Sequence, residues 1–130
     1  MIVVDASAAL EWLAQSAAGD RVARRLLAAP LHIHAPHVLD VEVTQALRRA
    51  VAAGALSLSR AMEGLQDYLD LPITRHPHEP FLWRMWDLRD NLDAYDAAYV
   101  ALAEYLGATL LTCDAKIRAA SGHSAVVELV

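Results

Sequence analysis

The sequence predicts a single α/β domain, in which helices cover both faces of a central parallel β-sheet. Three observations support this prediction. The chain has 130 residues, which suits one domain with a substantial core. Short apolar runs alternate along it with longer segments of helical periodicity. The clearest short run, residues 2–4, is apolar throughout, which is typical of a strand buried on both faces.

In the N-terminal third, residues 2–4 are expected to form a strand that ends at Asp5. Asp5 and the polar residues after it are suited to cap a helix over 8–13. A second helix is expected over 19–29, because its leucines and valines share one face, and Pro30 ends it.

The middle of the chain continues the alternation. Residues 31–35 alternate polar and apolar side chains like a strand, and Pro36 closes it. Apolar residues then recur every three or four positions over 38–53, which predicts a helix with Gly54 as its C-cap. A further helix is expected over 59–71, capped by one of the serines at its start.

The C-terminal half repeats the pattern. Residues 72–74 are expected to form a short strand, and helices are expected over 80–89 and 93–106. Residues 109–112 and 125–129 have the composition of buried strands. No repeat, low-complexity segment or linker interrupts the chain, so one domain over 1–130 is expected.

The bulk composition limits the possible classes of protein. Hydrophobic residues make up 56% of the chain, but the longest apolar run, 97–103, falls far short of the roughly 20 residues of a membrane-spanning helix. The N-terminus lacks the basic segment of a signal peptide. A single cysteine, Cys113, excludes an internal disulfide and indicates a cytoplasmic protein. The net charge of −5 disfavours tight, non-specific binding to nucleic acid.

Two acids occupy informative positions at strand ends. Asp5 follows the first strand, and Asp114 follows the strand over 109–112. Ligands of open parallel sheets bind at the carboxyl ends of the strands, where the strand order reverses. If the two strands are neighbours, these carboxylates face one another there. The alternative is that each only caps the helix that follows it.

Two more acids lie on apolar helical stretches. Glu42 lies early in its helix, and Asp96 lies in a helix that is apolar nearly all round. Exposure to solvent is the usual explanation of such acids, but a desolvated carboxylate needs a cation or hydrogen bonds. Four carboxylates that converge would repel one another unless a hard cation such as Mg²⁺ lay between them. Spacing alone leaves their convergence open.

The same residues carry a resemblance to a known family. In order and approximate spacing they resemble PIN domains, and most of all the VapC-type ribonuclease toxins of bacterial toxin–antitoxin pairs. The resemblance covers essentially the whole chain. Its most specific part is Asp96–Ala103, followed by the strand that ends in Asp5. The segments that carry it are residues 2–8, Pro36 to Glu42, 95–103 and 111–114.

The resemblance implies a Mg²⁺-dependent endoribonuclease, in which Mn²⁺ can substitute and a metal-activated water cleaves RNA. It implies that one acidic quartet holds the metal and is catalytic: Asp5, Glu42, Asp96 and Asp114. Ser7 and Thr112 match positions that often place a hydroxyl near the site. A cognate VapB-like antitoxin and a homodimer are also implied.

Several features depart from the family pattern or admit two interpretations. Gln45 stands where relatives often have Asn, which puts polar support there in doubt. Asp93 and Asp40 are extra acids that are expected to cap their helices. The basic residues near the quartet either contact RNA or line solvated faces; these are Arg48, Arg49, Lys116 and Arg118. The tryptophans are expected in the core, with a partner surface as the alternative; these are Trp12, Trp83 and Trp86.

Other functions are weighed against the nuclease. The histidines at 32, 34, 37, 76 and 78 lack a recognised zinc spacing. No G-x-S-x-G motif of a serine hydrolase is present. Asp5-Ala6-Ser7 fits neither a receiver domain, which has paired acids, nor a phosphatase D-x-D. Two alternatives remain open: a PIN-like binding module with an inactive site, and a housekeeping RNA-processing nuclease.

Overall fold

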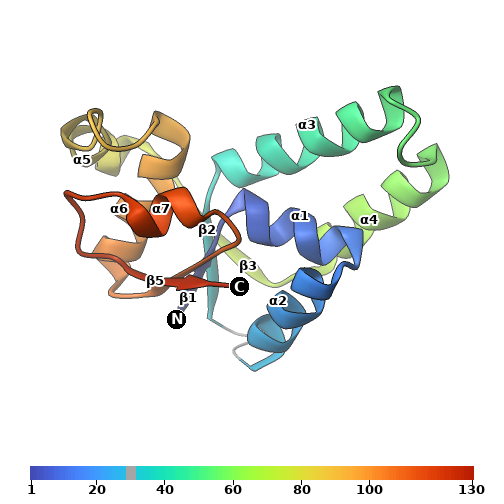
Figure 1. Ribbon diagram of the computed structural model, residues 1–130, viewed down its shortest axis with the longest axis horizontal. Helices are drawn as coiled ribbons and strands as arrows, with labels where there is room; N and C mark the ends of the chain where they lie inside the picture. The colour runs from blue at the N-terminus through green and yellow to red at the C-terminus, as the bar shows by residue number, and fades with distance from the viewer. Residues whose placement is uncertain (29–31) are drawn as a thin grey trace.

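The computed structural model describes residues 1–28 and 32–130, and it confirms the expected α/β fold with a parallel sheet (Figure 1). Five strands pair in the order β3-β2-β1-β4-β5, and every neighbouring pair is parallel. The strands are β1 (Ile2–Val4), β2 (Ile33–Pro36), β3 (Ile73–His76), β4 (Thr109–Thr112) and β5 (Val126–Leu129).

Seven α-helices and one 3₁₀ turn connect these strands in the described residues. The helices are α1 (Ala6–Ala14), α2 (Ala17–Ala28), α3 (Val38–Ala52), α4 (Leu58–Asp70), α5 (Leu82–Asp87), α6 (Ala94–Leu106) and α7 (Ala115–Ala119), and the turn η1 spans Glu79–Phe81. The expected helix over 80–89 is therefore divided into η1 and α5, and α7 is the short helix expected after Asp114 if that residue acts as a cap. Ala29 and Leu31, at the expected ends of a helix and a strand, lie outside the described residues.

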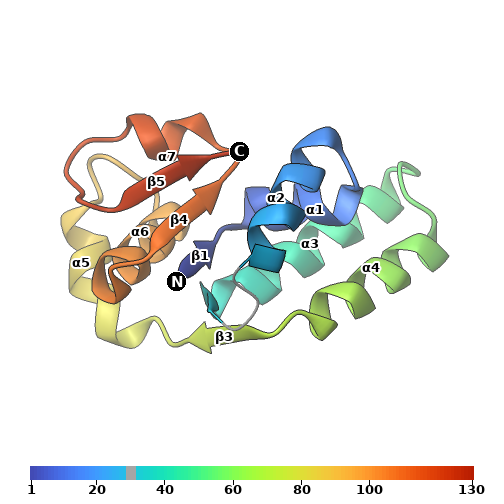
Figure 2. The same cartoon turned by 90° about the horizontal axis from the view of Figure 1, so that it is seen from below.

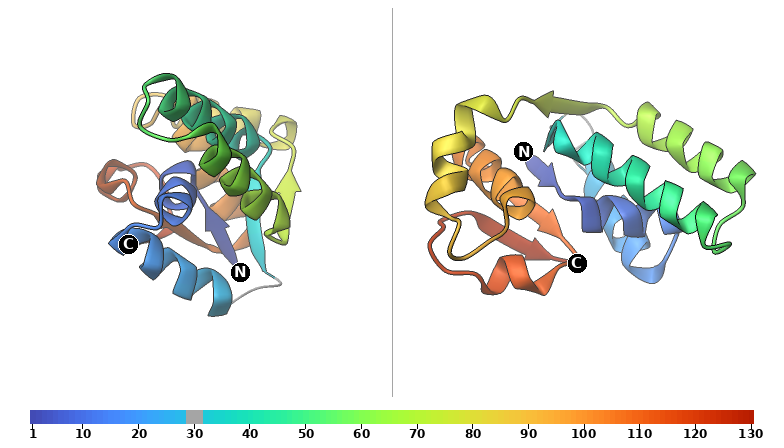
Figure 3. Two further views of the ribbon diagram at one scale, coloured as in Figure 1. Left: turned by 90° about the vertical axis from the view of Figure 1, so that its right-hand side faces the viewer. Right: turned by 90° about the horizontal axis from the view of Figure 1, so that it is seen from above.

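The strand order reverses between β1 and β4. The chain first builds outward from β1 through β2 to β3, and α1 to α4 lie in these connections. It then returns through α5 and α6 to β4 on the other side of β1. Because such crossovers are right-handed, the reversal places α1–α4 on one face and α5–α7 on the other. Figure 2 shows these two groups of helices at opposite ends of the view, and in Figure 3 α3 and α4 run side by side.

The core centres on β1 and α6. All three residues of β1 are buried, as is every residue of α6 from Ala97 to Ala103. Contacts join α6 to β1, β2 and β4, which explains why this helix is apolar on nearly all its faces. Gly107 ends α6 in the left-handed conformation, with φ of 60°. The core thus fixes α6 against the central strand, whose end carries Asp5.

Two expectations about side chains are wrong. Trp83 and Trp86 are 82% and 60% exposed, because α5 is only six residues long and the inward contacts of this region are made by Met85 and Leu88. Trp12 is partly buried against the core.

The second wrong expectation concerns Asp40, which does not cap α3. Its carboxylate accepts hydrogen bonds from Tyr68 at 2.6 Å and from Nε of Arg75 at 2.9 Å. These bonds join α3 to α4 and β3.

None of the helices within residues 1–28 and 32–130 combines the length and apolar character that crossing a membrane requires.

The close crossing of α1 and α2 generates a stability prediction. A Cβ atom at Gly19 would lie 2.1 Å from the backbone oxygen of Glu11, so Gly19→Ala forces two helix backbones apart. We expect a loss of about 1–3 kcal/mol in the free energy of unfolding, measured by chemical denaturation. Gly64→Ala is the control, because its Cβ meets only side-chain atoms at 3.6 Å or more and an interior helix position favours Ala. Equal stability of the two variants would contradict the prediction.

Candidate functional site

Asp5 and Asp114 lie at the ends of neighbouring strands, as the strand-end argument requires. β1 pairs directly with β4, with Val4 opposite Leu111. The backbone N–H of Asp5 donates to the carbonyl oxygen of Leu111 at 3.2 Å. Both aspartates also cap the helices that follow, because Asp5 accepts from Ala8 N at 2.9 Å and Asp114 accepts from Lys116 N at 2.8 Å. Each aspartate therefore both caps a helix and lies at the carboxyl end of a strand.

The Asp5 carboxylate is buried, and both of its oxygens accept hydrogen bonds. Asp5 is only 3% exposed. Its Oδ1 accepts hydrogen bonds from Ser7 Oγ at 2.7 Å and from Ala8 N, and its Oδ2 accepts a short one from Thr112 Oγ1. Burial raises its pKa, the three donors offset part of this effect, and the charge of Asp114 raises the pKa further. Its orientation is therefore set before any ligand arrives.

Ser7 and Thr112 are held so that their hydroxyl protons point at Asp5. Ser7 Oγ accepts from the backbone N–H of Cys113 at 2.8 Å, and Thr112 Oγ1 accepts from that of Asp114 at 2.9 Å. Because each oxygen already accepts a backbone hydrogen bond, its own proton is available to the carboxylate. The turn after β4 thus orients the acid that follows β1.

Asp96 contrasts with Asp5, because its carboxylate has no hydrogen-bond partner among the residues that the structure describes. It lies in the first turn of α6, where Asp93 caps the helix by accepting from Asp96 N at 2.8 Å. Asp93 is thus the helix cap that the sequence indicates. Burial, together with the negative charges of Asp93, Asp114, Asp5 and Glu42, raises the pKa of Asp96 to about 6. Asp96 therefore shares one electrostatic environment with the rest of the quartet.

Glu42 reaches the same environment from α3. Burial is the main cause that raises its pKa, and the charges of Asp5 and Asp93 raise it further. A short hydrogen bond from the hydroxyl of Tyr99 to Glu42 Oε2 opposes this shift. The sequence did not single out Tyr99, since an aromatic residue within an apolar helix looks like core. The available signal was its spacing: Tyr99 follows Asp96 by three residues and so shares its helix face.

The quartet carries uncompensated negative charge. None of the ion pairs found among the described residues includes one of its members. No three His, Cys, Asp or Glu side chains in residues 1–28 and 32–130 are gathered closely enough to hold a metal ion without moving. The available donors are carboxylate and hydroxyl oxygens, which hard divalent cations prefer. The donor chemistry fits such a cation, and binding one requires the carboxylates to draw together.

The four basic residues close in sequence to the quartet have varied contacts. Arg48 donates to Gln45 at 2.9 Å, so Gln45 supports an arginine rather than an acid. Arg49, Lys116 and Arg118 are exposed, and the last two lie on α7, directly after Asp114.

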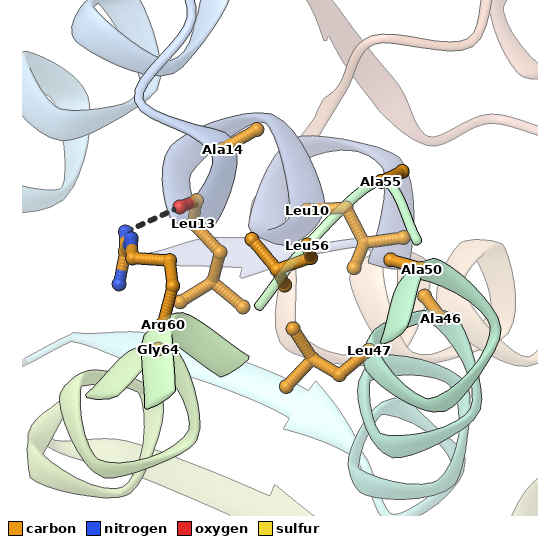
Figure 4. Close-up of a pocket in the computed structure, with 10 residues that line it drawn as sticks. All are labelled: Leu10, Leu13, Ala14, Ala46, Leu47, Ala50, Ala55, Leu56, Arg60 and Gly64. Carbon is orange, nitrogen blue, oxygen red and sulfur yellow. Dashed lines mark hydrogen bonds between the residues drawn. The ribbon is translucent and has the colours of Figure 1, made fainter. Parts of the chain in front are cut away.

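Two apolar cavities lie beside α3 in the described part of the chain, and no member of the quartet lines either of them. One of about 250 Å³ lies between α1, α3 and α4, where Figure 4 shows Leu10, Leu47 and Leu56 around it. At its edge Arg60 donates to the backbone oxygen of Leu13 at 2.9 Å. A groove of about 430 Å³ lies between α3 and α4. The acids that follow β1 and β4 therefore lie outside both cavities.

Comparison with known proteins decides the family. The PIN-domain family model matches residues 2–122. The chain belongs to the PIN-domain family. A relative of this PIN-domain chain, ribonuclease VapC12 of Mycobacterium tuberculosis, is 45% identical over 130 residues, which span 100% of this chain and 99% of the relative. The resemblance to VapC-type proteins is thereby confirmed.

Two solved structures share the fold of this PIN-domain chain. PAE2754 from Pyrobaculum aerophilum superposes with a TM-score of 0.74 at 22% identity, covering 97% of this chain and 87% of that one. VapBC2 from Rickettsia felis, bound to a DNA fragment from its promoter, superposes with a TM-score of 0.75 at 13% identity, covering 99% and 98%.

The raised pKa of Asp96 generates a prediction about stability and pH. Between its ordinary value of 3.8 and about 6, the folded chain keeps a proton that the unfolded chain has lost. Stability therefore falls as pH rises through this window. In chelator at pH 7, Asp96→Asn should raise the midpoint of thermal unfolding above that of the wild type. At pH 3.5 the gain should vanish.

Thermal melts of both proteins across this pH range test the prediction, with Asp90→Asn, an exposed acid in a turn, as the control. A gain that is independent of pH, or that Asp90→Asn reproduces, would contradict it.

Proposed function

We propose that this chain is a metal-dependent endoribonuclease, the toxin of a VapBC-like toxin–antitoxin pair. The observation that carries the proposal is the electrostatic coupling of four carboxylates at the point where the strand order reverses, none of which forms an ion pair within the described residues. A ligand of the opposite charge is what such a site requires. The full-length similarity to a protein named as a ribonuclease supplies the reaction class.

We propose Mg²⁺ as the natural ion, with Mn²⁺ able to replace it. A bound ion of this kind supplies positive charge to phosphate oxygens and makes a water more acidic. Asp5 and Asp96 are its principal holders in the proposal, and Glu42 and Asp114 complete the set. Asp5 is preoriented by Ser7 and Thr112, whereas the unpartnered Asp96 is able to turn towards an arriving cation. Lys116 and Arg118 lie beside Asp114, where they can contact the RNA backbone.

The first test is RNA cleavage by the chain purified without a partner, assayed with Mg²⁺, with Mn²⁺ and with chelator. We expect cleavage that depends on the metal and that Asp96→Asn lowers by about 100-fold or more, because the ligand charge is lost. Because water is the proposed nucleophile, the products should carry 5′-phosphate and 3′-hydroxyl ends. Glu63→Gln removes an exposed acid of α4 and should leave the rate unchanged.

Cyclic phosphate ends would refute the proposed mechanism. A folded chain that binds neither Mg²⁺ nor Mn²⁺ and cleaves no RNA would instead support a binding module with an inactive site. Cleavage without any inhibitory partner encoded beside the gene would favour a housekeeping nuclease.

We also propose that the PIN domain extends over all 130 residues, because β5 pairs with β4 beyond the matched range of 2–122.

A cytoplasmic location is proposed from the single unpaired Cys113. A VapB-like antitoxin is proposed from the VapC relatives. The open crevice beside the acids would allow such a partner to block it.

A homodimer is proposed through the α5 surface, which we define as Leu82, Trp83, Trp86 and Tyr95. All four side chains are more than half exposed. The surface is continuous, because Leu82 lines one hollow with Tyr95 and a second with Trp86. Exposed aromatic residues clustered in this way are typical of protein interfaces.

Sedimentation velocity tests this surface. Trp86→Glu should weaken self-association by on the order of tenfold or more, because a charge replaces an aromatic contact. Met62→Glu, at an equally exposed apolar position on α4, should leave the dimer intact. A wild-type monomer, or equal effects of the two substitutions, would refute the α5 surface as the interface.

A further inference from the structure

Tyr99 places its hydroxyl, the only polar group of its side chain, against Glu42 of the quartet. The side chain is 1% exposed and lies in the core, yet its hydroxyl donates a short hydrogen bond to Glu42 Oε2. The bond spans 57 positions of sequence and joins α6 to α3. No other hydrogen bond to the Glu42 carboxylate occurs within the described residues, so Oε1 is left unengaged.

We propose that Tyr99 is a positioning residue, which holds one oxygen of Glu42 so that the other faces the cation. This inference rests on the proposed metal-dependent function. Glutamate has three side-chain torsions, and an unheld carboxylate on α3 would lose much freedom on binding an ion. A fixed hydroxyl removes that freedom in advance.

A tyrosine suits this position because it is neutral. A lysine or arginine partner would also orient Glu42, but its charge would oppose the cation that the site is proposed to bind. The hydroxyl directs the carboxylate and leaves the negative charge of the crevice intact. The same helix thus supplies Asp96 to the site and, one turn later, the donor that orients Glu42.

The chain contains a matched control. Tyr68 is 2% exposed, and its hydroxyl also donates to an acid of α3, Asp40, at 2.6 Å. That acid is paired with Arg75 and lies outside the quartet. Each of the two substitutions, Tyr68→Phe and Tyr99→Phe, removes a hydroxyl that donates a hydrogen bond to a carboxylate of α3, and each leaves a buried ring in place. Only Tyr99→Phe alters the site.

The test is Mn²⁺ affinity, measured by electron paramagnetic resonance of the free ion with the purified chain and no RNA. Tyr99→Phe should weaken binding by about 10-fold, which is usual for the loss of a group that orients a metal ligand. Tyr68→Phe should stay within about twofold of the wild type. In a Glu42→Gln background, Tyr99→Phe should have no further effect.

Unchanged affinity in Tyr99→Phe, or equal losses in both tyrosine variants, would overturn the inference. If the wild type itself binds no Mn²⁺, or if Glu42→Gln binds as tightly as the wild type, the proposed metal site fails instead.

If Tyr99→Phe does not fold, the wild-type chain labelled with 3-fluorotyrosine provides the answer. The chain has four tyrosines, so each fluorine resonance can be assigned. On titration with Mg²⁺ the resonance of Tyr99 should move and that of Tyr68 should not. A Tyr99 resonance that stays fixed while Mg²⁺ binds would overturn the inference.

Discussion

The burial of the Asp5 carboxylate is the constraint on which the rest of the site depends. A carboxylate that is 3% exposed requires several hydrogen bonds, and these come from two separate segments: Ser7 and Ala8 in the first turn of α1, and Thr112 at the end of β4. Thr112 reaches Asp5 only if β1 and β4 are neighbours in their observed register. The strand order, the start of α1 and the turn that carries Asp114 are therefore coupled to one buried charge.

Glu42 and Asp96 oppose the stability of the fold that assembles them. Each raised pKa in the quartet means that the folded chain disfavours the charged form. The buried stretch of α6 from Ala97 to Ala103 offsets this cost, because it packs against three strands and holds Asp96 at the crevice. At functional sites, repulsion among charged side chains is usually offset by a well-packed core beside them.

Sequence reasoning located what depends on local patterns. The acids at the ends of β1 and β4 were predictable, because an apolar strand and the polar residue after it adjoin in sequence. The partners of Asp40 and Glu42 were not, because Tyr68 and Tyr99 lie on other helices and reach them only when those helices pack against α3. Trp86 was assigned to the core because helical spacing does not reveal that α5 is short and lies at the periphery.

The two acids of α3 show how structure and function separate on one helix. Asp40 and Glu42 are two residues apart, which at 3.6 residues per turn places them on roughly opposite faces. Each accepts a hydrogen bond from a buried tyrosine, but only Asp40 also has an arginine, Arg75, at 2.9 Å. A purely structural carboxylate gains from such neutralisation. Glu42 is oriented without it and keeps its charge, which is the arrangement expected of a group whose cation comes from outside the chain.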